Sequence, residues 1–162
     1  DALPLGEDEG FDLWKIAKRG RPYAYARQLR GPDKVFTGQR STAHTPEVVE
    51  RFAHVAPGGI DAIGRHPRLD WDGQCPTLRA GTGSDRGSYQ SVRPIHPTEN
   101  RVITVREAAR LQGFPDAHRF HPTIWHSFRM IGNSVSPIIA KALFEAVRSK
   151  LQLREPLRIA AE

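Results

Sequence analysis

The sequence lacks the features that mark secreted and membrane proteins. It has a single cysteine among 162 residues, which excludes an internal disulfide framework and is typical of a reducing compartment. No apolar run approaches the roughly 20 residues that a membrane-spanning helix needs. No stretch combines the charged start, apolar segment and small cleavage site of a signal peptide. We therefore expect one cytoplasmic domain with a modest core and no membrane partner.

Lysine is also scarce, and this shapes the positive charge of the chain. Only 5 of the 24 basic residues are lysines and 19 are arginines. Arginine carries a planar fork of donors that suits phosphate oxygens and guanine edges. The first twelve residues are acidic, whereas between Lys15 and Arg93 fourteen basic residues stand against seven acidic ones. This asymmetry indicates nucleic acid as the leading partner; the alternative is an arginine-rich surface exposed to solvent.

Short strands and loops are expected in the first hundred residues, because 14 glycines and 13 prolines punctuate the chain. Residues 23–29, YAYARQL, alternate enough to predict a short strand, although residues 1–43 otherwise carry no clear pattern. Residues 57–100 are predicted to be loops with short strands. Val102 and Ile103 are predicted to end a strand.

Three helices are predicted from their boundaries. The first starts with Thr45 as N-cap and Pro46 at the first helical position, and Pro57, Gly58 and Gly59 stop it. Its buried stripe is predicted to comprise Val48, Val49, Phe52, and Val55 or Ala56.

The second and third helices lie near the end of the chain. The second has a capping box of Thr104 and Glu107 and a C-cap glycine at Gly113. The third starts at Ser136 and Pro137 and carries an apolar face formed by Ile139, Leu143, Ala146 or Val147, and Leu151. The fold class is therefore α+β: a small irregular domain of short antiparallel strands and loops with about three helices.

The segment GTGSDRGS, residues 81–88, has no large apolar side chain and cannot belong to a core. A flexible linker is one interpretation. Arg79 and Arg86 flank or interrupt the segment and Tyr89 follows it, so a loop that enters a DNA groove is the other. For each arginine the alternative is a side chain that faces solvent.

Three stretches together resemble the C-terminal part of bacterial Dcm-like DNA (cytosine-5)-methyltransferases. They are PTLRAGTGSDRGSYQSVRPIHP, RVITVREAARLQGFPD and MIGNSVSPIIAKAL. The second resembles the family's ninth conserved motif and GNSV resembles its tenth. The segment HTPEVVERFAHVAPGG is similar, more loosely, to part of the family's target-recognition region.

The resemblance implies an enzyme whose catalytic motifs are missing from this sequence. In the family, the nucleophile lies in a Pro-Cys-Gln motif and the essential glutamate lies in a Glu-Asn-Val motif. A glycine-rich turn holds S-adenosylmethionine on a doubly wound sheet. None of these three motifs occurs in this sequence. Cys75-Pro76 reverses the order of the first motif, and Glu99-Asn100 only mimics the second. We therefore predict no catalytic residue in this chain, and expect Cys75 to be a small half-buried side chain.

The resemblance also implies two binding roles. Residues predicted to contact duplex DNA are Thr77, Leu78, Arg79, Ser84, Arg86 and Tyr89. Asn133 and Ser134 match the residues that complete the pocket for S-adenosylmethionine, which would require the missing catalytic domain; an ordinary helix cap is the alternative. Arg106 and Arg110 are expected to pair with acids rather than DNA. No metal site is expected, since His118 and His121 have no third ligand nearby in sequence and suit a surface or capping role.

The expected organisation follows these motifs. Residues 1–100 are assigned to target recognition, 101–130 to a helix and connector, 131–151 to the cofactor turn and last helix, and 152–162 to a tail. The expected partners are double-stranded DNA and an N-terminal catalytic domain, in cis or in trans, with self-association through an exposed last helix. Three interpretations stay open: a part of a longer methyltransferase, a subunit of a two-chain enzyme, or a stand-alone DNA-binding module. GNSV argues against the third, because a mere DNA binder has no use for a methyl-donor turn.

Overall fold

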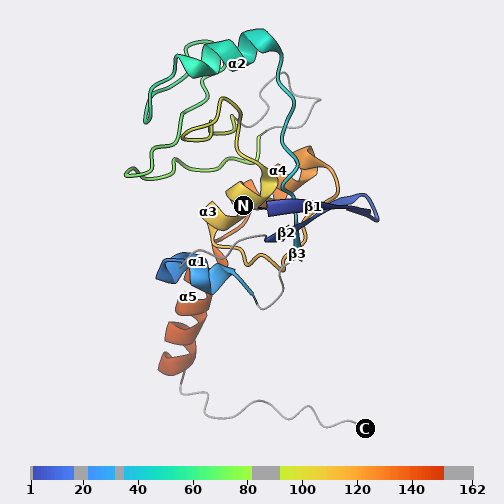
Figure 1. The fold of residues 1–162 in the computed structure, drawn as a ribbon. Coiled ribbons are helices and arrows are strands. Elements are labelled where there is room, and N and C mark those ends of the chain that lie inside the picture. Colours follow the sequence, from blue (N-terminus) through green and yellow to red (C-terminus); the bar gives the residue numbers. More distant parts are fainter. Residues whose placement is uncertain (1, 17–21, 32–34, 82–91, 152–162) are drawn as a thin grey trace.

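A three-stranded antiparallel sheet and five helices make up the part of the chain that the computed structural model describes, residues 2–16, 22–31, 35–81 and 92–151. The elements in chain order are β1 (Ala2–Asp8), β2 (Phe11–Ile16), α1 (Ala24–Leu29), β3 (Val35–Thr37), α2 (Pro46–Ala53), α3 (Val105–Gln112), α4 (Ile124–Gly132) and α5 (Pro137–Lys150). The sheet, α3 and α4 lie in the middle of the molecule, α2 covers loops above them, and α5 extends below (Figure 1). The α+β class is confirmed, but the expected number of about three helices was too low.

The sheet is built from the region in which the sequence showed no clear pattern. Strands β1 and β2 form a hairpin whose turn residues, Glu9 and Gly10, have φ angles of 49° and 81°. Such left-handed pairs suit the twist of a two-residue hairpin turn. Asp12 on β2 accepts hydrogen bonds from the backbone N–H groups of Gly38 and Arg40, at 2.8 and 2.6 Å. The carboxylate of Asp12, one of the acidic N-terminal residues, therefore holds in place the chain that follows β3.

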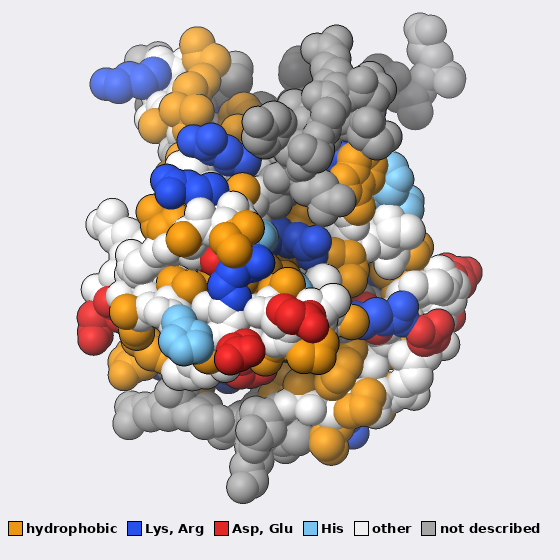
Figure 2. Space-filling model, turned by 90° about the horizontal axis from the view of Figure 1, so that it is seen from above, with side chains coloured by type: hydrophobic (Ala, Val, Ile, Leu, Met, Phe, Trp, Pro, Cys, Tyr) orange, Lys and Arg blue, Asp and Glu red, His pale blue; other side chains and the backbone are white. Residues whose placement is uncertain are grey.

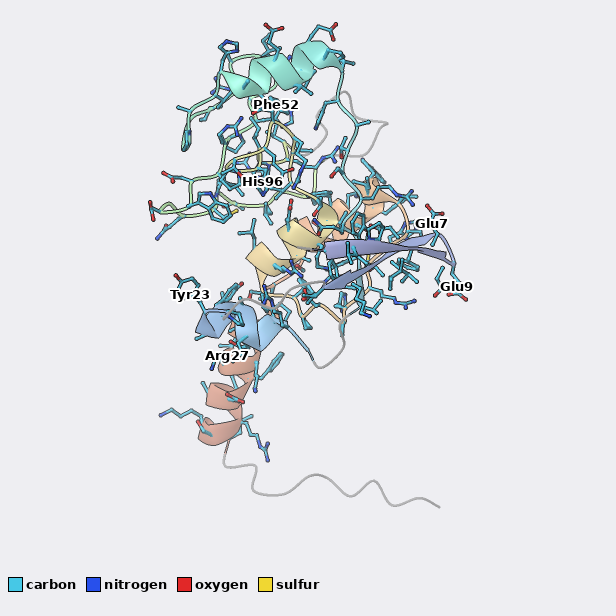
Figure 3. All side chains as sticks on the ribbon, in the orientation of Figure 1. Glu7, Glu9, Tyr23, Arg27, Phe52 and His96 are labelled. Atoms are coloured by element: carbon cyan, nitrogen blue, oxygen red, sulfur yellow. The ribbon has the colours of Figure 1, made fainter. Side chains whose placement is uncertain are left out.

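The strand predicted for residues 23–29 was wrong, because this segment forms helix α1. Alternating tyrosine and alanine look like a strand, but alanine is also the strongest helix former. The helix is held by tertiary contacts: Leu29 is buried, and the hydroxyl of Tyr25 donates a hydrogen bond to the carbonyl of Arg110 on α3, at 2.8 Å. Tyr23 and Arg27 point away from the body of the molecule (Figure 3).

Helix α2 begins where predicted, with Thr45 as N-cap and Pro46 in the first turn. Phe52 is buried and points toward the loops below, where His96 lies (Figure 3). Val48 and Val55 pack against it, but Val49 is 38% exposed, so its place in the predicted stripe was wrong. The helix ends at Ala53, before the expected Pro-Gly-Gly stop.

Two separate apolar clusters form the core. The larger joins α3 to α4 and contains Ile103, Val105, Ala108, Ala109, Phe128 and Ile131. The smaller lies under α2 and contains Phe52, Ile95 and Val102. Ile95 pairs with Arg68 and Val102 only through isolated bridges. Within the described part of residues 57–100, the predicted loops are confirmed, but isolated bridges take the place of the predicted short strands. Val102 and Ile103 do not end a strand.

Both predicted ends of α3 are confirmed. The hydroxyl of Thr104 accepts from the N–H of Glu107, and the carboxylate of Glu107 accepts in return from the N–H of Thr104, at 3.2 and 2.8 Å. Gly113 ends the helix with a φ of 92°, a left-handed conformation that glycine adopts without strain.

Helix α5 starts at the predicted Ser136 and Pro137, yet it buries none of its residues. Ile139, Leu143 and Phe144 are 64%, 61% and 71% exposed. None of the helices in the described residues is long and apolar enough to span a membrane.

Candidate nucleic-acid interface and cofactor turn

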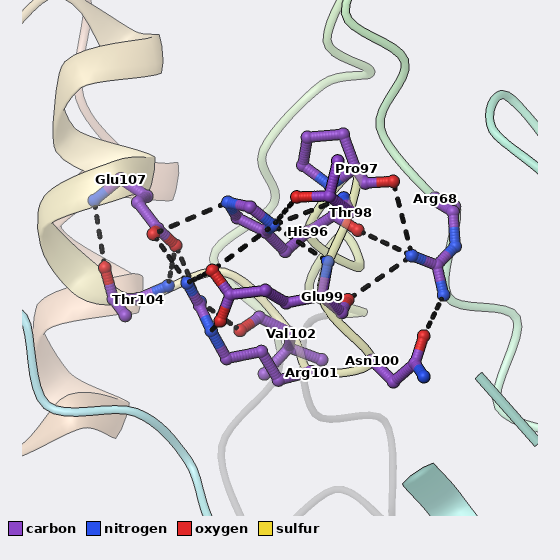
Figure 4. Close-up of polar contacts among 10 residues, drawn as sticks. All are labelled: Arg68, His96, Pro97, Thr98, Glu99, Asn100, Arg101, Val102, Thr104 and Glu107. Atoms are coloured by element: carbon purple, nitrogen blue, oxygen red, sulfur yellow. Dashed lines mark hydrogen bonds and ion pairs between the residues drawn. The ribbon is translucent and has the colours of Figure 1, made fainter. Parts of the chain in front are cut away.

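A network of charged side chains orders the loop that precedes α3 (Figure 4). The guanidinium of Arg101 donates to both oxygens of Glu107, each at 2.9 Å, and its Nε donates to Glu99 at 2.7 Å. Burial alone would raise the pKa of Glu107, but the hydrogen bonds from Arg101 and from the Thr104 backbone hold it below its ordinary value. Asn100 accepts a hydrogen bond from Arg68 at 2.9 Å. Glu99 and Asn100 are thus structural partners of arginines.

Buried arginines use much of their bonding capacity inside the molecule. Arg68 is 6% exposed and donates to the backbone carbonyls of Phe52 and His96, at 2.5 and 2.9 Å. Arg93 donates to the hydroxyl of Thr42 at 2.9 Å and stacks over the ring of Phe128. The excess of arginine in the sequence is therefore not all available to an outside partner.

Arg106 and Arg110 were both expected to pair with acids, and among the described residues only Arg110 does so. Arg110 pairs with Asp116, its Nε lying 2.8 Å from a carboxylate oxygen, as predicted. Arg106 has no acidic partner among the described residues: it is fully buried and donates to the carbonyls of Thr37, Pro115 and His118, at 2.8, 3.1 and 2.7 Å. Burial lowers the pKa of Arg106 to about 10. The prediction for Arg106 was wrong because sequence spacing cannot reveal that three carbonyls converge on one guanidinium.

Acidic and basic side chains share the face of the molecule that is seen from the α2 side. Viewed from the α2 side, Lys and Arg lie on the same face as Asp and Glu, with hydrophobic side chains between them (Figure 2). This face is therefore not uniformly positive.

Two half-buried histidines are held in their neutral form. The Nε2 of His44 accepts a hydrogen bond from the N–H of Val102, at 3.2 Å, and the Nδ1 of His96 accepts from the N–H of Glu99, at 3.1 Å. A protonated nitrogen cannot accept such a bond. Burial is the main reason why the pKa values of His44 and His96 lie below their ordinary value.

Acidification should therefore destabilise the fold well above the pH at which carboxylates protonate. A histidine with a lowered folded pKa takes up protons more readily when unfolded, so its contribution is complete above its unfolded pKa of about 6.5 and is lost as pH falls below it. We expect the urea midpoint of unfolding to be lower at pH 5.5 than at pH 7.5. The variant His96→Asn, which can accept a bond without titrating, should show a smaller decrease. A midpoint that is constant or rises on acidification would contradict this prediction.

Cys75 lies at the edge of a cavity of about 350 Å³ between α1, α3 and the segment 69–75. The thiol is half-buried and donates to the carbonyl of Pro76, at 3.2 Å. Burial raises its pKa above the ordinary value. Since the thiolate is the nucleophile, this environment suits the small, half-buried side chain that the sequence predicted.

The predicted DNA-contacting segment begins at residue 77, and its first three side chains alternate between exposed and partly buried. Leu78 packs against the larger core cluster, while Thr77 and Arg79 on either side of it are exposed. Leu78 thereby anchors the segment and directs its two neighbours outward. The other predicted contacts, Ser84, Arg86 and Tyr89, lie outside the described residues.

The predicted cofactor residues form the turn between α4 and α5. Asn133 caps α4 through its N–H, which donates to the carbonyl of Arg129 at 3.1 Å, and the residue is exposed. The hydroxyl of Ser134 donates to the carbonyl of Ile131 at 2.6 Å, and its own carbonyl accepts from Gln112 at 2.8 Å. The turn is therefore fixed in place, with the Asn133 amide on the surface. An exposed amide and short polar side chains at the start of a helix are suitable groups for a polar ligand.

The structure brings this turn and the predicted DNA-contacting segment together. The peptide between Arg79 and Ala80 lies against Gly132, the residue just before Asn133. Sequence reasoning missed Gly132 and Gln112, although the glycine of GNSV could have signalled a close approach of backbone.

The two histidines considered as metal ligands have other surroundings. His118 packs against the rings of Phe114 and Phe120, and His121 accepts a hydrogen bond from the N–H of Thr123 at 3.0 Å. Among the described residues, no group of three or more histidine, cysteine, aspartate or glutamate side chains could hold a metal ion.

Comparisons with known proteins identify a family that matches most of the chain. The model of the C-5 cytosine-specific DNA methylase family matches residues 21–149. The chain is 47% identical over 155 residues to the Type II methyltransferase M.XorII of Xanthomonas oryzae pv. oryzae, covering 85% of this chain and 37% of that protein. It is 44% identical over 80 residues to mouse DNA (cytosine-5)-methyltransferase 1, covering 49% of this chain and 5% of that protein.

A solved structure is similar over nearly the whole chain. It is described as a DNA modification methyltransferase encoded within a prophage of E. coli, and it superposes with a TM-score of 0.75 at 40% identity. The match covers 90% of this chain and 42% of that one. The chain thus spans about two fifths of the relatives that it matches along most of its own length. With its family match and its fold in agreement, the chain belongs to the C-5 cytosine-specific DNA methylase family.

Proposed function

We propose that this chain is the DNA-recognition segment of a methyltransferase that transfers a methyl group from S-adenosylmethionine to carbon 5 of cytosine in duplex DNA. The observation that carries the proposal is the contact between the DNA-contacting segment and the turn at Asn133, in a chain of this family. A base inside a duplex is out of reach, so an enzyme of this kind takes it out of the stack. One part of the protein must then grip the DNA around the extruded nucleotide.

The proposed DNA contacts are Thr77, Leu78, Arg79, Ser84, Arg86 and Tyr89. Thr77 and the backbone at Leu78 would hold phosphates, which fixes the register of the protein on the DNA. Arg79 would contact a phosphate or a guanine edge, since its guanidinium is exposed. The core contact of Leu78 supports this arrangement, because an anchored backbone holds its neighbours in a set direction.

Asn133 and Ser134 are proposed to complete the pocket for S-adenosylmethionine, which supplies the methyl group. The Asn133 amide is on the surface and would bind a polar group of the cofactor. The hydroxyl of Ser134 is already bonded to Ile131, so we assign it mainly to holding the turn. One turn encloses too little of such a ligand to bind it alone, and the remaining walls would come from the catalytic portion.

The catalytic portion is the second proposed partner, in cis or in trans. Helix α5 buries no residue and exposes Ile139, Leu143 and Phe144. The cavity beside α1 and α3 exposes further apolar surface, including Tyr25 and Trp71. Exposed apolar patches of this kind mark interaction sites. We assign residues 131–151 to docking and cofactor completion, 101–130 to a connector and 1–100 to recognition, in the bacterial cytoplasm, and expect the chain alone to self-associate through α5.

DNA binding tests the recognition role. We expect the chain to bind a duplex oligonucleotide with an affinity that falls steeply with salt. Arg79→Ala should reduce the slope of log K against log salt by about 0.9, the change for one lost phosphate contact. Arg27→Ala, at another exposed arginine, on α1, should leave the slope unchanged. Fluorescence anisotropy at several salt concentrations measures both, and salt-independent affinity would rule out the proposed contact.

A further inference from the structure

Gly132 allows two backbone segments to touch. A Cβ atom built at this position would lie 2.3 Å from the backbone nitrogen of Ala80 and 2.5 Å from the carbonyl carbon of Arg79. Both distances are far shorter than any real contact of a Cβ atom. Gly132 is the last residue of α4 and is not among the glycines with positive φ. It is therefore required by space and not by backbone conformation.

A Cβ atom at Gly132 would make a closer contact than a Cβ atom at any other described glycine. A Cβ at Gly64 would meet side-chain atoms of His66 and Asp61, and among the described residues a Cβ at Gly31 would meet nothing within 4 Å. The three atoms nearest to Gly132 all belong to the backbone of Arg79 and Ala80. A side chain here would have to displace either α4 or the DNA-contacting segment.

Rigid connections extend from this contact in both directions. On one side, Leu78 packs into the cluster that contains Phe128 and Ile131 of α4. On the other side, Asn133 follows directly, and Ser134 is fixed by Ile131 and Gln112. Packed interiors transmit displacement rather than absorb it. Movement of the backbone at Arg79 therefore displaces the turn at Asn133, and movement of that turn displaces the backbone at Arg79.

We infer that Gly132 is a positioning residue that couples DNA binding to cofactor binding. DNA that restrains the backbone at Arg79 also restrains the Asn133 turn through the contact at Gly132. DNA therefore raises the affinity for the cofactor, and the cofactor raises the affinity for DNA. The coupling must be reciprocal, because it is a difference in free energy between the same four states. This inference rests on the proposed function, since it uses the two sites assigned there.

The test measures the coupling in the active methyltransferase, with this chain joined to or mixed with its catalytic portion. Calorimetry gives the affinity for S-adenosylhomocysteine, which cannot react, with and without a duplex oligonucleotide. In the unaltered protein we expect DNA to tighten this affinity by a factor of roughly 5–150, the usual range for coupled sites. In Gly132→Ala the factor should fall to about two or less.

Three further variants separate coupling from a general loss of structure. Gly31→Ala adds the same methyl group where a Cβ meets nothing, so it should keep the full factor. Asn133→Ala removes the amide through which the turn is proposed to act on the cofactor, so it should weaken S-adenosylhomocysteine more in the presence of DNA than in its absence and should reduce the factor. Gln112→Ala removes the hydrogen bond to Ser134 without a clash, and should reduce the factor even where Gly132→Ala does not fold.

The outcomes distinguish the inference from the proposed function. The inference is wrong, and the proposed function stands, if both ligands bind but DNA changes the affinity for S-adenosylhomocysteine by a factor near one in the unaltered protein. The same conclusion follows if both ligands bind and the factor is unchanged in Gly132→Ala and Gln112→Ala. If the unaltered protein binds neither ligand, the proposed function itself fails.

Discussion

Replacing Arg106 with methionine is expected to lower the free energy of unfolding by about 3 kcal/mol or more, because each buried acceptor that loses its donor costs about 1–3 kcal/mol. The guanidinium donates to three carbonyls, of Thr37, Pro115 and His118. Methionine fills similar space but donates nothing, so these carbonyls would lose their donor. Because Thr37 lies on β3, the substitution also removes one hydrogen bond between the sheet and α3.

Urea unfolding measures this effect, with the slope against denaturant used to check that the unfolding reaction is unchanged. Arg106→Lys should recover only part of the loss, because a single ammonium cannot reproduce the planar fork. Arg27→Met serves as the control: Arg27 is exposed on α1, and such surface changes stay within about 0.5 kcal/mol. A loss of that small size for Arg106→Met would mean that the buried guanidinium does not hold the fold together.

The second large effect concerns catalysis. The chain alone should incorporate only background amounts of labelled methyl groups into duplex DNA, whereas addition of the catalytic portion should raise the rate by about 10⁶-fold or more, the scale of enzymatic acceleration. Its one thiol, Cys75, is half-buried and its pKa is raised by burial, so it is a poor source of the thiolate nucleophile.

Cys75→Ser is the matched variant for this assay, and it should leave the restored activity unchanged. Incorporation by the chain alone that Cys75→Ser abolishes would make Cys75 the nucleophile. Incorporation by the chain alone that survives the substitution would place an active site elsewhere in this chain. Either result would overturn the proposed division between recognition and catalysis.

Local signals in the sequence predicted the ends of helices best. The capping box of Thr104 and Glu107, the left-handed Gly113 and the starts of α2 and α5 were all confirmed. Each depends on hydrogen bonds or backbone preferences within a few residues. The same kind of reasoning was wrong for residues 23–29, where the partners of Tyr25 and Leu29 lie far along the chain and decide between helix and strand.

The sequence by itself determined the family, the helix boundaries and the residues that are candidates for DNA and cofactor binding, because motifs and caps are short-range patterns. Tertiary structure alone decided that Arg68 and Arg106 face inward and that Thr77 and Arg79 face outward. It also decided that the peptide after Arg79 lies against Gly132. The physical reason is that burial and close backbone contact arise from chain segments that are distant in sequence, and no local pattern records which of them meet.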